Sequence, residues 1–243
     1  MYKYFVSILI TGLVQSSFCQ AQYKLDDLDL SGNLYSWYDA AIGKNNTGIL
    51  IGEYQPIFRN SKNTHQFYIS DQWTYSLLSF RNQTYDSIAL LYDLDNDVLV
   101  IRHPTDFRFH SQPIKVTQSQ VAWFRLHDHT FKYYDENEPA PDPGFYDELF
   151  AGENIKLFVK RIKNMETSQT SEYISADKYY FSHQGKYYRI GGRITFLRIF
   201  KENRPKIRRY AISNRLKIKT RPEYEANMIQ LSQYINDLLT ERP

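Results

Sequence analysis

Runs of apolar residues, interrupted by short polar turns, dominate the first two thirds of the chain. In the clearest example, residues 87–102, two apolar stretches flank the acidic turn at 93–97. Both stretches are apolar on both faces, which is typical of strands inside a covered sheet. A further strand is predicted at 120–126, and two further hairpins at 145–162 and 178–190.

Helical spacing replaces this pattern after the two glycines at 191–192. Apolar positions predict a short helix over 195–201, and Pro205 suits the first turn of a second helix. Residues 215–220 alternate basic and apolar side chains, which predicts an extended segment with the apolar side chains inward. Residues 224–239 keep helical spacing over four turns, so a final amphipathic helix is predicted there.

These elements predict an α+β fold. The main part is a mainly antiparallel β-sheet, twisted or half-barrel, and a short C-terminal helical segment packs on it. We expect a β-rich domain over residues 22–192. The helical segment over 193–243 is too short to fold alone and is assigned to the same domain.

The first 21 residues have the organisation of a secretory signal peptide. Lys3 precedes the apolar run 5–14, and small residues end at a cleavage site after Ala21. That run is shorter than the roughly 20 residues that span a membrane, and no later run is longer, so no transmembrane segment is expected in the mature chain. Cys19 raises the alternative of a lipoprotein, but Phe18 stands where a small residue normally precedes a lipidated cysteine. We therefore expect an exported protein that is periplasmic or associated with the outer membrane.

Composition excludes several classes of site. The chain has 243 residues, of which 42% are hydrophobic, a single cysteine and a formal net charge of +3. Cleavage after Ala21 removes that cysteine, which excludes a disulfide framework and cysteine-based metal sites. No P-loop, nucleophile elbow, zinc-protease or dinucleotide-binding motif is present. The sequence therefore assigns no catalytic residue and no cofactor.

Positive charge is concentrated in residues 201–221, which contain nine basic residues and a single acidic residue, Glu202. Because the net charge of the whole chain is small, the rest of the protein is acidic. Such a stretch suits an anionic lipid surface or an acidic envelope protein, whereas export separates the protein from nucleic acid. The alternative is a solvated helix face with an edge strand protected by basic side chains. The candidate binding residues are Lys206, Arg208, Arg209, Arg215, Lys217 and Lys219.

His127 and His129 form the sharpest local cluster of metal-binding side chains. Two histidines two positions apart on one strand point to the same face, and zinc sites use such pairs with a third ligand from elsewhere. His103 and His110 are candidates for that third ligand. Surface histidines at a strand end are the alternative interpretation.

Two adjacent acids, Asp147 and Glu148, lie within the strand predicted after residue 144. Neighbours on a strand point to opposite faces, so these two carboxylates do not form a local acid and base pair.

Three segments carry a resemblance to a family of uncharacterised exported proteins of Bacteroidota-type bacteria. They are YDLDNDVL at 92–99, PGFYDELFAG at 143–152 and DKYYFSHQGKYYR at 177–189, followed by the basic helix after Pro205. The resemblance implies export and a single architecture. It implies no activity and no catalytic residue.

These observations leave three functional hypotheses open. The first is a non-enzymatic envelope protein that acts as a binding or scaffold module, with the basic helix as its docking surface. The second is a periplasmic carrier that holds a lipid or another apolar ligand between the sheet and the C-terminal helices. The third is a metal-dependent enzyme that uses His127 and His129.

Overall fold

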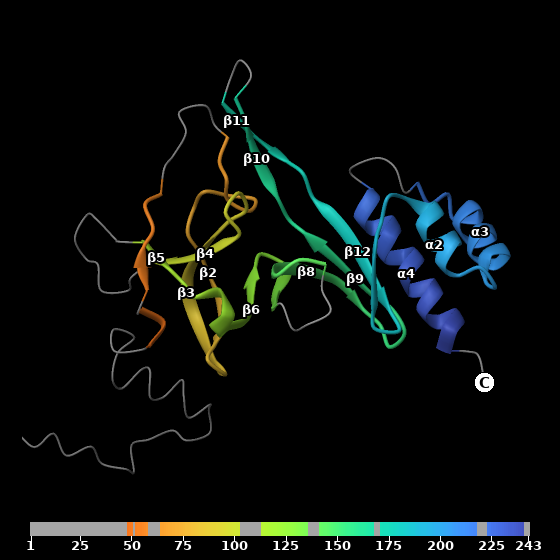
Figure 1. Ribbon diagram of the computed structural model, residues 1–243, viewed down its shortest axis with the longest axis horizontal. Helices are drawn as coiled ribbons and strands as arrows, with labels where there is room; N and C mark the ends of the chain where they lie inside the picture. The colour runs from red at the N-terminus through yellow and green to blue at the C-terminus, as the bar shows by residue number, and fades with distance from the viewer. Residues whose placement is uncertain are drawn as a thin grey trace, which may run out of the picture.

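The computed structural model describes residues 48–50, 52–57, 64–102, 113–135, 141–167, 171–217 and 223–240. An open antiparallel sheet forms one part of the molecule, and helices pack at one end of it (Figure 1). This confirms the predicted fold class. The predicted signal peptide lies outside the described residues.

The main sheet contains eleven strands in the order β1-β5-β4-β3-β2-β6-β7-β8-β9-β12-β13, with β1 and β13 at its edges. Every neighbouring pair is antiparallel. The strands are β1 (Glu53–Tyr54), β2 (Thr74–Phe80), β3 (Gln83–Asp93), β4 (Val98–Arg102), β5 (Pro113–Lys115), β6 (Val121–Leu126), β7 (His129–Tyr134), β8 (Gly144–Ala151), β9 (Lys156–Lys160), β12 (Lys178–His183) and β13 (Lys186–Arg189). Two short 3-10 helices, η3 (Gly48–Leu50) and η4 (Gln118–Gln120), precede β1 and β6.

The β3–β4 hairpin shows how the local sequence sets the structure. From Ile88 to the turn, β3 is buried on both faces, and so is β4 up to Ile101, as their continuous apolar pattern predicts. At the turn, the Asp93 carboxylate accepts hydrogen bonds from the backbone N–H groups of Asp95 and Asn96 at 3.0 and 3.1 Å. The acidic run is therefore turn chemistry in this structure. The predicted hairpins β8–β9 and β12–β13 also form.

A two-stranded arm extends the β9–β12 pair beyond the main sheet. It consists of β10 (Lys163–Glu166) and β11 (Glu172–Ser175), which pair antiparallel. At its base, the Lys163 ammonium donates hydrogen bonds to the carbonyl oxygens of His65 and Phe67 at 2.8 and 2.6 Å. The arm is thereby attached to the segment that precedes β2.

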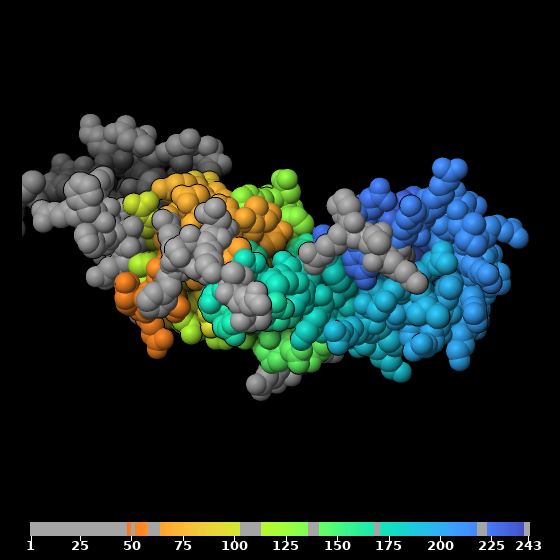
Figure 2. All heavy atoms as spheres, turned by 90° about the horizontal axis from the view of Figure 1, so that it is seen from above, coloured from red at the N-terminus to blue at the C-terminus, as the bar shows by residue number. Residues whose placement is uncertain are grey.

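The helical segment contains α2 (Arg193–Ile199), α3 (Arg204–Ser213) and α4 (Tyr224–Thr240). Pro205 lies in the first turn of α3, as predicted, and Asn214 follows the last residue of this helix. Space-filling atoms of these helices, in blue, gather at one end of the elongated body (Figure 2). Residues 215–217 do not form a strand, although Leu216 is buried as expected. The edge-strand interpretation of this part of the basic stretch is therefore wrong, because Arg215 turns the chain with φ 53°.

Two apolar cores lie on the same face of the sheet. One underlies β2 to β8, and in it the Phe124 ring contacts the rings of Phe131 and Phe145. The other lies between β9, β12 and the helices. In the sheet register, Asp147 stands between Phe131 of the first core and Val159 of the second. A buried carboxylate therefore marks the boundary between the two cores.

Candidate functional site

The predicted basic residues lie mainly on α3 and in the segments that flank it. Ile207 and Ala211 of α3 are buried against the second core, so the basic side chains of this helix point away from it. All basic residues between 201 and 217 are exposed. Lys219 lies outside the described residues. We call the following seven residues the basic surface: Lys201, Arg204, Lys206, Arg208, Arg209, Arg215 and Lys217.

A groove of about 480 Å³ runs along the outer side of α3. Its lining comes from two adjacent rows of the helix, Arg204-Arg208-Ile212 and Pro205-Arg209-Ser213. Ile212 is 57% exposed, although it is a large apolar side chain. The groove therefore combines three guanidinium groups with an apolar contact point.

The basic surface carries its charges close together on and around α3. None of its residues forms an ion pair with another residue of the described chain. The first turn of α3 contains no acidic residue and carries Arg204 and Lys206. Cations at a helix N-terminus are opposed by the helix dipole, so this placement costs rather than adds stability. By contrast, the first turn of α4 carries Glu225, which the dipole favours.

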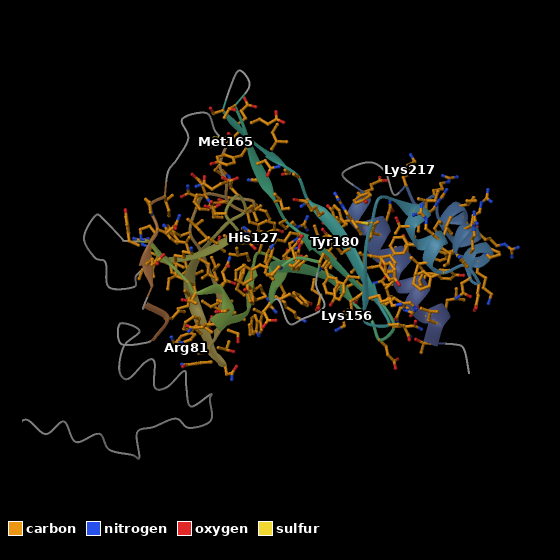
Figure 3. All side chains as sticks on the ribbon, in the orientation of Figure 1. Arg81, His127, Lys156, Met165, Tyr180 and Lys217 are labelled. Atoms are coloured by element: carbon orange, nitrogen blue, oxygen red, sulfur yellow. The ribbon has the colours of Figure 1, made fainter. Side chains whose placement is uncertain are left out.

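The structure does not place His127 and His129 on one strand, and that premise of the metal hypothesis is wrong. His127 lies in the turn between β6 and β7, with φ 52°, and His129 is the first residue of β7. His129 pairs in register with Leu126 across the turn. Alternation along a continuous strand therefore does not apply to these two side chains. Figure 3 labels His127 near the middle of the molecule, away from Lys217 at the helical end.

Candidate third ligands for the predicted metal site, His103 and His110, lie outside the described residues. Within the described ranges, no group of three or more histidine, cysteine, aspartate or glutamate side chains is arranged to hold a metal ion. His129 instead forms an ion pair through Nδ1 with Oδ2 of Asp147 at 2.8 Å.

A buried charge cluster surrounds Arg161, between the two cores. The guanidinium donates from Nε and Nη2 to Oδ2 of Asp147 at 3.0 and 2.6 Å. It also donates to Asp177 at 3.2 Å and, through both Nη atoms, to the carboxylate of Glu225. The hydroxyl of Tyr179 donates to Glu225 at 2.6 Å. These contacts join β8, the base of the arm and the first turn of α4.

Burial and hydrogen bonding shift the pKa values in this cluster. Burial alone would raise the pKa of Glu225, but hydrogen bonds from Arg161 and Tyr179 lower it. The hydrogen bond to Asp147 raises the pKa of His129 above its ordinary value, although burial opposes this. Burial raises the pKa of Tyr68, whose ring lies 5.9 Å from the Arg161 guanidinium. The shifts are accounted for by internal partners, which indicates a structural ion-pair network.

Sequence reasoning did not identify this cluster. Arg161 and Asp177 were not singled out, and Glu225 lies 64 positions after Arg161. The prediction that Asp147 and Glu148 point to opposite faces is confirmed, because Asp147 joins the cluster and Glu148 pairs with Lys132 at 2.8 Å. A charged residue directly after the apolar strand β9 was the only indication available from the sequence.

The interface between α4 and the sheet is packed with buried side chains. Met228, Leu231 and Ile235 of α4 are fully buried against Leu157 and Phe181 of the strands. These side chains share one apolar core at the place where the carrier hypothesis requires a ligand.

Comparisons with known proteins assign no family to the chain. A scan against protein-family models, a search of curated proteins and a search of solved structures each found no match. The resemblance to an exported family therefore stays a prediction. Across the ranges that the structure describes, no helix combines the length and the apolar character needed to cross a membrane.

Proposed function

We propose that this protein is an exported binding or scaffold module of the cell envelope, without catalytic activity of its own. It docks on an anionic partner through the basic surface. The observation that carries this proposal is the exposure of seven basic side chains on and around α3, none of them paired with another described residue. The signal-peptide pattern of residues 1–21 supports export.

The packing of α3 supports a docking role because it holds the helix in one orientation. Ile207 is fully buried, and the Tyr210 ring stacks on the Tyr234 ring of α4 with centroids 3.8 Å apart. The neighbouring side of α3 is therefore attached to α4, and α4 in turn packs on the sheet. A helix supported in this way needs no further ordering of its backbone when it binds, which lowers the entropic cost of binding.

The unfavourable charge arrangement of α3 supports the same proposal. Like charges on successive turns repel one another, and the helix dipole opposes the bases of the first turn. Folding alone does not require this arrangement, since Ile207 and Ala211 already supply the buried contacts of the helix. An anionic partner would relieve both penalties.

The test is co-sedimentation of the mature protein with envelope membranes from the cells that produce it. The double variant Arg208→Glu/Arg209→Glu reverses two exposed charges of the groove. A matched control, Arg125→Glu/Lys156→Glu, changes the net charge equally at exposed positions of β6 and β9. Circular dichroism of each variant verifies that the fold is retained.

We expect the wild-type protein and the control to sediment with the membranes, and the α3 variant to remain in the supernatant. Equal sedimentation of both variants, or failure of every form to bind, would contradict the proposed function.

A further inference from the structure

The proposed docking function leaves the chemistry of the partner open, and this inference rests on that function. We infer that the basic surface binds a lipid surface that carries anionic phosphate headgroups, and that Ile212 enters the lipid between them. The occupant is thus a membrane surface rather than an acidic protein.

Arginine dominates the groove along α3, and this favours phosphate. Three of the six lining residues, Arg204, Arg208 and Arg209, carry guanidinium groups. A guanidinium is planar and offers paired N–H donors that match two phosphate oxygens at once. The remaining lining residues are Pro205, Ile212 and Ser213, so the groove has no carboxylate that would repel a phosphate.

The same lining disfavours a peptide as the occupant. A peptide segment offers backbone N–H donors, which need acceptors on the protein. Apart from the Ser213 hydroxyl, the side chains of the groove offer no acceptor, because guanidinium groups only donate. A lipid phosphate needs donors alone, and the groove supplies them.

The exposed side chain of Ile212 favours a lipid surface over a partner that offers only negative charge. Its side chain is 57% exposed in the same groove as Arg208 and Arg209. Basic side chains around an exposed aliphatic residue match a membrane interface, where the bases contact headgroups and the aliphatic group enters the acyl boundary. A soluble polyanion offers no apolar layer for that side chain.

The distribution of the bases also fits a plane of many small anions. Lys201 precedes α3, four bases lie on it, and Arg215 and Lys217 follow it. These residues belong to the helical end of the elongated body, where Figure 3 labels Lys217 (Figures 2 and 3). A base near an anionic membrane contributes about a fivefold gain in affinity, so several together produce strong binding.

The test is flotation of the mature protein with protein-free vesicles. One set contains phosphatidylcholine alone, and a second set contains phosphatidylcholine with phosphatidylglycerol. We expect binding to the second set only, with a marked loss when salt is raised, because salt screens exposed charges. The variant Arg208→Glu/Arg209→Glu should bind at least about 25-fold more weakly, and the control Arg125→Glu/Lys156→Glu should bind like the wild type.

A second variant tests the apolar contact. Ile212→Ser keeps every charge and should weaken binding to the phosphatidylglycerol vesicles by about tenfold, the value of one inserted aliphatic side chain. Unchanged binding of Ile212→Ser would overturn the insertion of this residue.

The vesicle and membrane experiments together distinguish failure of the proposed lipid partner from failure of the proposed docking function. Sedimentation with envelope membranes that depends on Arg208 and Arg209, combined with no binding to phosphatidylglycerol vesicles, would overturn the lipid partner and leave the docking function intact. Absence of α3-dependent binding in both experiments would overturn both.

Discussion

Replacing Arg161 by methionine should destabilise the fold by about 3–5 kcal/mol, the usual cost of removing one partner from a buried ion pair. Arg161 and Asp147 have side chains that are only 8% and 1% exposed. Methionine keeps the aliphatic length of the side chain and removes every N–H donor. The substitution therefore tests the charge of Arg161 rather than its volume.

The magnitude depends mainly on Asp147. Its Oδ2 atom accepts two hydrogen bonds from Arg161, whereas its buried Oδ1 atom has no hydrogen-bond partner among the described residues. Without Arg161, the His129 ion pair is the remaining contact of this carboxylate. Glu225 is 30% exposed and can regain water, so its contribution to the loss is smaller.

The assay is urea unfolding of the mature protein, followed by tryptophan fluorescence and circular dichroism. Lys132→Met is the control, because it breaks a similar 2.8 Å pair with Glu148 in which Lys132 is 41% exposed. We expect that control to lose less than about 1 kcal/mol. In a double variant, Asp147→Asn should restore part of the stability lost in Arg161→Met, since the unpaired buried charge is removed.

Two results would refute this reasoning. One is a loss in Arg161→Met no larger than that of the Lys132→Met control. The other is strict additivity in the double variant, because two residues in direct contact are expected to couple.

Three further predictions concern packing, a backbone constraint and pH. Leu231→Ala should cost about 2–5 kcal/mol in urea unfolding because Leu231 is fully buried, and a loss below about 1 kcal/mol would contradict tight packing around this side chain. Gly144→Ala should destabilise more than Gly185→Ala: both glycines have positive φ, but an added Cβ at 144 would also collide with Lys160 and Asp97, whereas the space at 185 is open. A smaller loss at 144 would refute this. His129→Gln should lower the free energy of unfolding most below about pH 6.5, because the folded state raises the pKa of His129 and the protonated imidazole then contributes its full stabilisation. This contribution is lost as the pH rises through the pKa of His129 in the folded state. The charged groups around the imidazole are Asp147, Arg161 and Glu225. An unchanged difference in unfolding free energy between acidic and alkaline pH would exclude that role.

Hairpins and helix starts were predictable because their determinants are local. The acidic turn after β3 contains its own hydrogen-bond acceptor in Asp93, and the β12–β13 turn contains Gly185 with φ +70°. Pro205 in the first turn of α3 and the apolar spacing of α4 are equally local. Such features depend on residues a few positions apart, which a sequence pattern displays directly.

The prediction that His127 and His129 share one strand was wrong because of a local turn, which the pattern of apolar and polar residues does not reveal. The pattern predicts a strand over 120–126 and an extended chain from His127 to His129. The chain instead turns at His127, which adopts a positive φ that a non-glycine residue adopts only occasionally. His127 therefore lies in the turn itself, and His129 begins the next strand.

The sequence by itself determined the hairpins β3–β4, β8–β9 and β12–β13, the three helices near the C-terminus, and which stretch carries the excess positive charge. The tertiary structure alone decided that β2 lies between β3 and β6, and that Arg161 meets both Asp147 and Glu225. It also decided that the basic side chains of α3 face outward together, because burial of Ile207 and Ala211 sets the rotation of the helix. Strand order and charge partners depend on contacts between residues that are distant in the sequence. Many alternative pairings look alike in the local sequence, so the sequence pattern does not show which of them forms.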